Sequence, residues 1–442
     1  MSPSQAPSPA LVWYGDDFTG ATDTLGTAAR AGLHALLFLK TPDAALLARA
    51  GALDVVGIAG AARAMSPEEM RAELQPVAAL FRSIGARVLH YKTCSTFDSA
   101  PQIGSIGAAI AVLRHAVETP WTAIVGGQPN LGRYCLFGHL FAAAGSGGEV
   151  HRLDRHPTMS RHPVTPMHES DLRRHLAAQG VARVASVPYT AASGPARLQA
   201  ALDGALGTAP DAVLFDVSAA AELDAIGAVL WAQAEVATLL AVGPSSVVQA
   251  LAAFAGRGTS KPGATASPPA RRVEPATGPV LVMAGSMSPV SAQQVAAAQA
   301  FDRLTLDADA LAHADATALD RYADALAGPL AAGRHLLVTL SGAVLAGDAD
   351  GRDLARAGGA LLARVLARVP LRRVGIAGGD TSSHAVQALD AWGLSYEADI
   401  GAGAALCRLH SDVPSLDGME IMLKGGQMGT ADVFDRLVHG AD

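Results

Sequence analysis

Short apolar runs alternate with longer amphipathic stretches along most of the chain. In the first half the runs are Leu11–Gly15, Asp54–Ala59, Val88–Tyr91, Thr122–Val125, Val213–Asp216 and Thr238–Val242. The segments between them, such as Ala21–Gly32, Pro67–Ile84 and Ile103–Val117, have helical spacing. In the second half the runs are Val280–Ala284, His335–Leu340, Arg373–Ala377 and Glu420–Leu423. This alternation predicts an α/β fold in each half, with a largely parallel sheet flanked by helices.

One stretch interrupts the pattern. Residues 256–279 are rich in Gly, Pro, Ser and Thr and contain almost no apolar side chains, as an exposed linker does. We therefore predict an N-terminal domain over residues 1–255 and a C-terminal domain over residues 280–442. In parallel sheets, functional residues follow the carboxyl ends of the strands, so the turns after the apolar runs are the places to search.

Composition narrows the class of protein. The 442 residues are 50% hydrophobic and carry a formal net charge of −7, which argues against a general nucleic-acid binder or a protein held to anionic lipid by charge. Three separated cysteines are too few for a disulfide framework. The polar N-terminus has no secretory signal, and no apolar run reaches the ~20 residues of a membrane span. We expect a cytoplasmic globular protein that binds a small molecule, with no nucleic-acid or membrane partner.

The first predicted strand leads directly into the sequence DDFTGATD, residues 16–23. Adjacent carboxylates before a helix could hold a metal, accept the proton of a substrate hydroxyl, or cap the helix. Capping needs one residue, whereas Asp16, Asp17 and Asp23 crowd into eight positions. This favours a chemical role for the pair Asp16 and Asp17.

A second polar loop follows the run Val88–Tyr91. It contains Lys92, Ser95, Thr96 and Asp98, and such hydroxyls with one lysine can bind a polyhydroxy acid. Only four of the 33 basic residues are lysines, which makes Lys92 more informative than an average loop lysine.

Two further segments offer positive charge. Arg133 follows a glycine turn after Thr122–Val125, where an arginine can bind a carboxylate through two hydrogen bonds, although a plain turn is nearly as compatible. Between His151 and His175 lie five histidines among arginines, including Arg155 and His156. The prolines there indicate an extended loop without paired-histidine spacing, so we expect a cationic loop over an anionic substrate rather than a histidine metal site.

Three turns of small residues follow strands of the second half. They are GSMSP with Ser286 and Ser288, GGDTSSH with Gly378, Gly379, Asp380 and Thr381, and KGGQMG with Lys424, Gly425 and Gly426. Close backbone approach and N–H groups at helix starts suit the phosphates of a nucleotide. Neither a GxxxxGK[ST] nor a strand-linked GxGxxG sequence is present, which disfavours a P-loop NTPase and a dinucleotide dehydrogenase.

Taken together, DDFTGATD, GSMSP, AGGDTSSHAVQAL and LKGGQMG resemble the signatures of the four-carbon acid sugar kinase family, typified by 3-oxo-tetronate and threonate 4-kinases. The resemblance covers nearly the whole chain. It implies a sugar-acid-binding N-terminal domain, an ATP-binding C-terminal domain, and phosphoryl transfer across the cleft between them.

By position, the resemblance implies roles for most of these residues. Asp16 and Asp17 would meet the substrate hydroxyl, with Asp17 as the expected activating group. Thr19, Lys92, Ser95, Thr96 and Asp98 would contact the substrate, Arg133 its acid group, and Arg155 and His156 would contribute from the cationic loop. Ser286, Ser288, Gly378–Thr381 and Lys424–Gly426 would hold ATP, with Mg²⁺ on its phosphates and no assigned protein ligand for the metal.

One departure from the family pattern bears on the identity of the substrate. Typical members carry an arginine-glycine pair in the substrate loop, where this chain has STFDSAPQIGSIG. Together with the segment GRYCLFGHLF to RLDRHPTMSRHPVTP, this resembles a subgroup associated with RuBisCO-like proteins, for which 3-oxo-isoapionate, a branched sugar acid, is the candidate substrate.

Two other functions stay open on the sequence. A metal-dependent sugar-acid lyase or isomerase would use the N-terminal acids without a nucleotide. A non-catalytic sensor of nucleotide or sugar acid would bind without releasing ADP. Homodimerisation is a further expectation.

Overall fold

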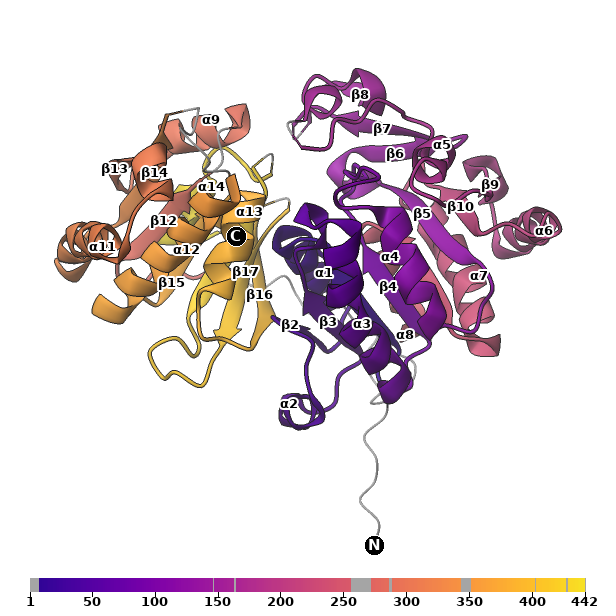
Figure 1. Cartoon of the computed structure of the whole chain (residues 1–442), viewed down its shortest axis with the longest axis horizontal. Helices are drawn as coiled ribbons and strands as arrows, with labels where there is room; N and C mark the ends of the chain where they lie inside the picture. The colour runs from indigo at the N-terminus through magenta and orange to yellow at the C-terminus, as the bar shows by residue number, and fades with distance from the viewer. Residues whose placement is uncertain are drawn as a thin grey trace, which may run out of the picture. The chain divides into compact units, whose positions relative to one another are not determined.

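The computed structural model describes residues 8–441 apart from 146, 163, 256–271, 286–287, 343–350, 402 and 427. The chain divides into two compact units, Met1–Pro268 (unit 1) and Pro269–Asp442 (unit 2). Both units are built of a sheet and flanking helices (Figure 1). This confirms the predicted α/β class.

Unit 1 contains eleven strands and eight α-helices among its described residues. They are β1 (Leu11–Gly15), α1 (Phe18–Arg30), β2 (Ala35–Phe38), α2 (Ala44–Ala50), β3 (Val55–Ala59), α3 (Pro67–Ile84), β4 (Val88–Lys92), α4 (Ile106–Leu113), β5 (Thr122–Gln128), β6 (Arg133–Leu136), β7 (His139–Ala143), β8 (Val150–Arg152), α5 (Leu172–Ala177), β9 (Val184–Val187), α6 (Pro195–Leu206), β10 (Ala212–Asp216), α7 (Glu222–Val236), β11 (Leu239–Gly243) and α8 (Ser246–Ala255). Short 3₁₀ turns, among them η1 (Ala62–Ala64) and η3 (Pro129–Leu131), join several of these elements.

The main sheet of unit 1 is parallel, with strand order β2-β3-β1-β4-β11-β5-β10-β9. Every residue of β1, β3, β4, β5, β10 and β11 is buried, as expected for strands covered on both faces. The flanking helices form two groups, in which α3 packs on α4, while α1 and α7 pack on α8.

Local sequence explains where α3 begins. Ser66 Oγ accepts from Glu69 N at 3.3 Å, and the Glu69 carboxylate accepts from Ser66 N at 2.7 Å. Pro67 occupies the first helical position, where its missing N–H costs nothing. The predicted range Pro67–Ile84 matches the observed helix, because the sequence contains this complete start signal.

An antiparallel extension, β5-β6-β7-β8, leaves the carboxyl end of β5. The Asp216 carboxylate, at the end of β10, accepts from Phe137 N and Gly138 N and holds the β6–β7 turn, where Phe137 has φ 53°. The sequence analysis expected an extended loop in the histidine-rich region, and β8 (Val150–Arg152) adds a short strand there.

Unit 2 contains a second, mixed sheet with order β13-β14-β12-β15-β18-β17-β16. The pairings β18–β17 and β17–β16 are antiparallel, and the other pairings are parallel. Its elements are β12 (Val280–Ala284), α9 (Pro289–Ala297), β13 (Asp302–Asp307), α10 (Ala308–Ala312), α11 (Ala316–Ala331), β14 (Leu336–Ser341), α12 (Gly351–Arg368), β15 (Arg373–Ala377), α13 (Gly379–Gln387), β16 (Gly393–Gly401), β17 (Ala404–His410), β18 (Glu420–Lys424) and α14 (Val433–His439).

The C-terminal part of the segment predicted as a linker, residues 256–279, belongs to unit 2. Residues 256–271 lie outside the described residues, but Val273 is buried in the core of unit 2 and forms an antiparallel bridge with Ala441. A single valine among prolines gives no periodic signal, which is why composition alone assigned it to the linker. Across the described residues, no helix is both long and apolar enough to cross a membrane.

Candidate active site

Four loops of unit 1 start from one row of the sheet. The last residues of β3, β1, β4 and β11 are register partners across the sheet: Ala59 faces Gly15, Gly15 faces Lys92, and Lys92 faces Gly243. Because these strands are parallel, the loops that follow them emerge together at the carboxyl edge.

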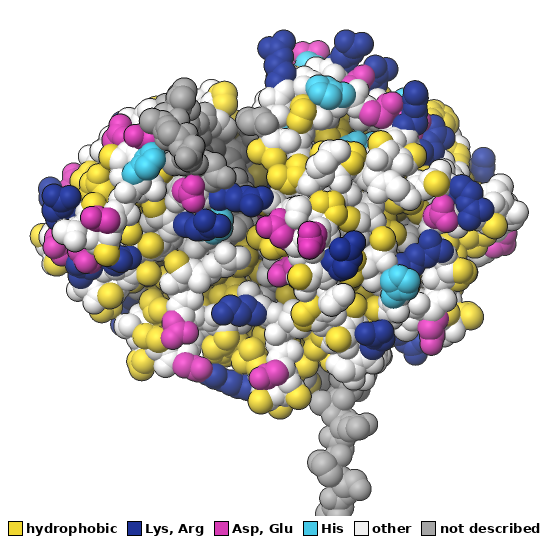
Figure 2. Space-filling model, viewed as in Figure 1, with side chains coloured by type: hydrophobic (Ala, Val, Ile, Leu, Met, Phe, Trp, Pro, Cys, Tyr) yellow, Lys and Arg dark blue, Asp and Glu magenta, His cyan; other side chains and the backbone are white. Residues whose placement is uncertain are grey.

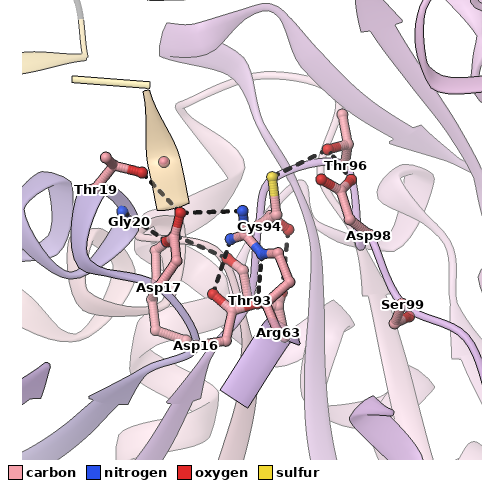
Figure 3. Close-up of polar contacts among 12 residues, drawn as sticks. Asp16, Asp17, Thr19, Gly20, Arg63, Thr93, Cys94, Thr96, Asp98 and Ser99 are labelled. Carbon is pink, nitrogen blue, oxygen red and sulfur yellow. Dashed lines mark hydrogen bonds and ion pairs between the residues drawn. The ribbon is translucent and has the colours of Figure 1, made fainter. Parts of the chain in front are cut away.

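The loops after β1 and β3 meet in an ion-paired cluster of Asp16, Asp17 and Arg63 (Figure 3). Arg63 donates from Nη2 and Nε to the two Asp16 oxygens at 2.9 and 3.3 Å. Its Nη1 lies 3.0 Å from Asp17 Oδ2. One guanidinium therefore bridges both carboxylates.

Asp17 also caps α1. Its Oδ1 accepts from Gly20 N at 2.8 Å, and its Oδ2 accepts from Thr19 Oγ1 at 2.7 Å. Asp17 therefore has the helix-capping role that the sequence analysis considered as the alternative to a chemical role. Only one of the two adjacent acids has this role. The Asp17 side chain is 10% exposed and that of Asp16 is 4% exposed, which leaves Asp17 the more accessible carboxylate.

The environments of the two acids move their pKa values in opposite directions. Burial raises the pKa of Asp16, and the Asp17 charge adds to this, while Arg63 and Lys92 offset it only in part. Burial acts on the pKa of Asp17 too, but Arg63, Lys92, Thr19 and the Gly20 N–H together lower it below its ordinary value. Asp17 is therefore the acid held ionised.

Lys92 ends β4 and is buried beside this pair. Its Nζ donates to Thr93 O at 2.9 Å, and its charge acts on Asp16 and Asp17. A Cβ atom on Gly20 would lie 2.3 Å from Lys92 Nζ and 2.5 Å from Asp17 Oδ1. The glycine of the DDFTGATD sequence thus leaves the space in which the ammonium and the carboxylate approach one another.

The loop after β4 adds a buried polar wall. Ser95, Thr96 and Asp98 are all buried, and the Thr96 hydroxyl donates to the Asp98 carboxylate. Cys94 Sγ lies 3.0 Å from Thr96 Oγ1 (Figure 3), and burial raises the pKa of the Cys94 thiol. The fixed hydroxyl and carboxylate offer hydrogen-bonding groups to a hydroxylated ligand, while Cys94 stays a protonated thiol.

Arg133 begins β6 and lies within electrostatic reach of Asp98 and Cys94. Burial lowers the pKa of its guanidinium, and its Nη1 donates to Leu131 O. The structure therefore brings Arg133 toward the polar loop that follows β4, as a half-buried cation suited to an anion.

The cationic loop is less uniform than the sequence indicates. Lys and Arg side chains do gather over β8 (Figure 2), but the Arg155 side chain is 78% exposed, 3.8 Å from Asp154. His156 is buried: its Nδ1 accepts from Thr158 N and Met159 N, and its Nε2 donates to Ala143 O at 3.3 Å. Burial lowers the pKa of His156, so this ring orders the loop as a neutral group.

In unit 2 the three glycine turns also start from one row. Ala284, Ala377 and Lys424 are register partners at the ends of β12, β15 and β18. Ser288 caps α9, and its hydroxyl donates to Gly426 O. Gly378 N donates to Lys424 O at 2.9 Å, and a Cβ on Gly285 would lie 2.3 Å from Thr381 Oγ1. Gly379, Asp380 and Thr381 form the first turn of α13, Gly425 lies in the turn after β18, and Ser286 lies outside the described residues.

Lys424 is fully buried in this row. Its Nζ donates to Gly425 O at 3.0 Å and lies 5.9 Å from the centre of the Phe434 ring. Burial lowers its pKa to about 8. A buried ammonium beside small-residue turns is a suitable partner for a phosphate.

A resident metal site is not apparent in the part of the chain that the structure describes, where no three His, Cys, Asp or Glu side chains converge. Mg²⁺ in kinases needs only one or two carboxylates because the nucleotide phosphates supply other ligands. Asp16 and Asp17 have the right chemistry for that smaller contribution.

Arg63 is the residue that the sequence analysis missed. It follows the apolar run Asp54–Ala59, which was predicted as a strand, but apart from the helix cap Ser66 its loop contains no second polar side chain. The available signal was its position, because the loops after neighbouring parallel strands share an edge.

Comparisons with known proteins cover both units. Residues 11–251 match the family model described as "Sugar-binding N-terminal domain", and residues 281–434 match "Nucleotide-binding C-terminal domain". A 3-oxo-isoapionate kinase of Paraburkholderia graminis is 39% identical over 97% of this chain and 94% of its own length. A 3-oxo-tetronate kinase of Methylobacterium radiotolerans is 31% identical over 97% of this chain and 98% of its own length.

Solved structures share the fold. A protein of Salmonella typhimurium LT2 superposes with a TM-score of 0.75 at 24% identity, covering 96% of this chain and 98% of that one. A protein of Haemophilus influenzae gives a TM-score of 0.68 at 22% identity, again over 96% and 98%.

Proposed function

Because the chain belongs to the four-carbon acid sugar kinase family and is thus a phosphotransferase, we propose that it transfers the γ-phosphoryl group of ATP to a terminal hydroxyl of a short oxo or aldonic acid. Unit 1 would bind the acid, and unit 2 would bind ATP. The observation that carries the proposal is the bridge from Arg63 to Asp16 and Asp17, which holds one carboxylate ionised at the edge where four loops converge.

In this reaction Asp17 would orient the substrate hydroxyl. As the hydroxyl oxygen bonds to the γ-phosphorus and the bond to the ADP oxygen breaks, the hydroxyl proton passes to Asp17. The positive charges of Arg63 and Lys92 keep Asp17 ionised before this step. Arg133 is the group we assign to the substrate carboxylate, because a partly desolvated guanidinium favours a ligand that brings a negative charge.

Unit 2 supports the nucleotide half of the proposal. The turns after β12, β15 and β18 present small residues and the Lys424 ammonium at one row. We assign Ser288, Gly378–Thr381 and Lys424–Gly426 to ATP. Mg²⁺, when bound with ATP, would neutralise charge on the phosphates.

For the substrate, we propose a branched 3-oxo acid of the 3-oxo-isoapionate type. Greater identity to the Paraburkholderia enzyme than to the Methylobacterium one supports this choice, as does the loop STFDSAPQIGSIG.

A coupled ADP-release assay tests the proposal. The full-length protein is incubated with ATP and Mg²⁺ and with four- and five-carbon aldonic, 3-oxo and branched acids, with each acid omitted in turn. We expect acid-dependent ADP release, with the branched 3-oxo acid giving the highest kcat/KM. Absence of ADP release with every acid, in protein whose melting temperature ATP raises, would reject kinase activity toward this class.

A further inference from the structure

Gln128 and Arg133 lie directly opposite one another at the carboxyl end of β5. They are register partners in the antiparallel pair of β5 and β6. Side chains of directly paired residues project from the same face of a sheet with their Cβ atoms about 5 Å apart. The two side chains are therefore neighbours.

Each of these side chains has one buried polar atom without a partner among the described residues: Oε1 of Gln128 and Nε of Arg133. Gln128 is 1% exposed. One of these atoms is a hydrogen-bond acceptor and the other a donor. A buried polar atom left unpaired is unfavourable, so a ligand that provides both missing partners would recover that cost on binding.

The orientation of the Gln128 amide is fixed by the third acid of DDFTGATD. Gln128 Nε2 donates to Asp23 Oδ2 at 3.0 Å, and Ser245, in the loop after β11, donates its hydroxyl to the same oxygen at 2.5 Å. The Ser245 hydroxyl in turn lies 2.9 Å from Thr24 Oγ1. Since a carboxylate only accepts, Asp23 must face the NH₂ group, and the carbonyl oxygen of Gln128 is the atom left for a donor.

We infer that Gln128 and Arg133 form a subsite for a 2-hydroxy acid. Arg133 binds the carboxylate, Gln128 Oε1 accepts the hydrogen bond of the hydroxyl on the adjacent carbon, and Asp23 is a positioning residue that acts through Gln128. This inference rests on the proposed function for the identity of the acid, and it adds the feature that the site recognises. Because both atoms are shielded from solvent, binding displaces side chains around them.

Binding, rather than turnover, tests this subsite. Isothermal titration calorimetry on the full-length protein compares erythronate and threonate, both enantiomers of each, with 3,4-dihydroxybutanoate, which lacks the 2-hydroxyl. The variants are Gln128→Met, which keeps the length of the side chain but removes the acceptor, and Asp23→Asn, which loosens its orientation. Thr122→Val is the matched control, because Thr122 also has a buried unpartnered hydroxyl but begins β5 instead of ending it.

In the wild type we expect the best tetronate to bind about 10- to 100-fold more tightly than its deoxy counterpart. The ratio should fall below about threefold in Gln128→Met, take an intermediate value in Asp23→Asn, and stay unchanged in Thr122→Val. Equal wild-type affinities for hydroxy and deoxy acids would overturn the subsite without any variant, as would a ratio that survives in Gln128→Met. Missing ADP release would instead reject the kinase reaction and leave this binding ratio unaffected.

Discussion

Gly20 and Lys92 approach so closely that a methyl group on the first would lie 2.3 Å from the ammonium nitrogen of the second. Gly20→Ala should therefore displace Lys92 from Asp17, although alanine favours a helix by up to about 1 kcal/mol over glycine. We expect kcat to fall by at least about tenfold. Steady-state kinetics on the acid substrate, with circular dichroism to confirm folding, measure this.

Gly204→Ala is the matched control, since a Cβ there would meet nothing within 4 Å in helix α6. It should leave kcat unchanged and raise the melting temperature slightly. If Gly20→Ala keeps full activity, the close packing around Lys92 has no part in the reaction.

Asp17→Asn tests the assignment of the ionised carboxylate. It should lower kcat by roughly 10²- to 10⁴-fold while ATP still stabilises the protein against heat, because the amide cannot take the hydroxyl proton. Asp43→Asn is the control, because Asp43 likewise caps a helix, accepting from Leu46 N at 2.8 Å at the start of α2. Comparable losses in both variants would mean that capping, rather than chemistry, is what Asp17 contributes.

The pH dependence of turnover follows from the same group. The pKa of Asp17 lies below its ordinary value, so its ionised form persists until the solution becomes strongly acidic. Between pH 5 and 8 we expect kcat/KM to show no inflection from this carboxylate, because even the ordinary aspartate pKa of about 4 lies below that range. An acidic inflection within this range that disappears in Asp16→Asn would instead identify Asp16, whose pKa is raised, as the proton acceptor.

Arg63→Met should destabilise the protein most near neutral pH. Two buried carboxylates then lose their shared cation, at a cost of about 3 kcal/mol in the free energy of unfolding. The pKa of Asp17 is lower in the folded protein than in the unfolded chain, so the ionised carboxylate stabilises the wild type at any pH above the unfolded pKa. This contribution is lost as the pH falls through the pKa of the folded protein. Urea unfolding at pH 7, 4 and 3 should show the difference from wild type shrinking only as the pH falls below the ordinary carboxyl pKa of about 4.

The exposed pair of Arg183 and Asp211 provides the comparison for Arg63. Its nitrogen and oxygen lie 3.3 Å apart and the Arg183 side chain is 64% exposed. Arg183→Met should change stability by less than about 1 kcal/mol. Similar effects of the two arginine substitutions would contradict the burial argument.

Lys424→Met should make the nucleotide-free protein more stable and weaken its binding of ATP. The folded pKa of Lys424 is about 8, below the ordinary 10.5, so the fold disfavours the charged form by about 2–4 kcal/mol at pH 7. Because the unfolded chain binds the extra proton between pH 8 and 10.5, the stability of the wild type should rise toward that of the variant over this window. ATP affinity of the wild type should fall as the pH rises through about 8.

Thermal unfolding with and without ATP, from pH 7 to 10, measures both effects. The exposed Lys40 supplies the control Lys40→Met, for which neither stability nor ATP affinity should change. A Lys424→Met protein that is less stable at pH 7, or that binds ATP as the wild type does, would contradict the assignment of Lys424.

Patterning predicted the central strands well because they are buried on both faces. Leu11–Gly15, Val280–Ala284 and Arg373–Ala377 have the expected ends, each where an apolar run meets Gly or Asp. The antiparallel strand β8 was missed because its apolar positions are few. In β8 only Val150 is aliphatic, and its burial is slight.

The candidate site was predictable where one motif holds several polar residues, as in Asp16 and Asp17. Arg63 and Gln128 were not, because each is a single polar side chain whose meaning depends on strands that are distant in sequence. Gln128 becomes informative only once β6 places Arg133 opposite it and α1 places Asp23 beside its amide. Spacing along the chain contains neither relationship.

The row formed by Ala59, Gly15, Lys92 and Gly243 has a consequence for how such enzymes diversify. Backbone pairing between neighbouring strands sets the level from which each loop leaves, and that pairing does not depend on what the loops contain. Mutation can then rewrite residues 93–99 while the scaffold beneath retains its hydrogen bonds. Descendants of one ancestral protein could thereby acquire different acids as substrates through exchange of short loops.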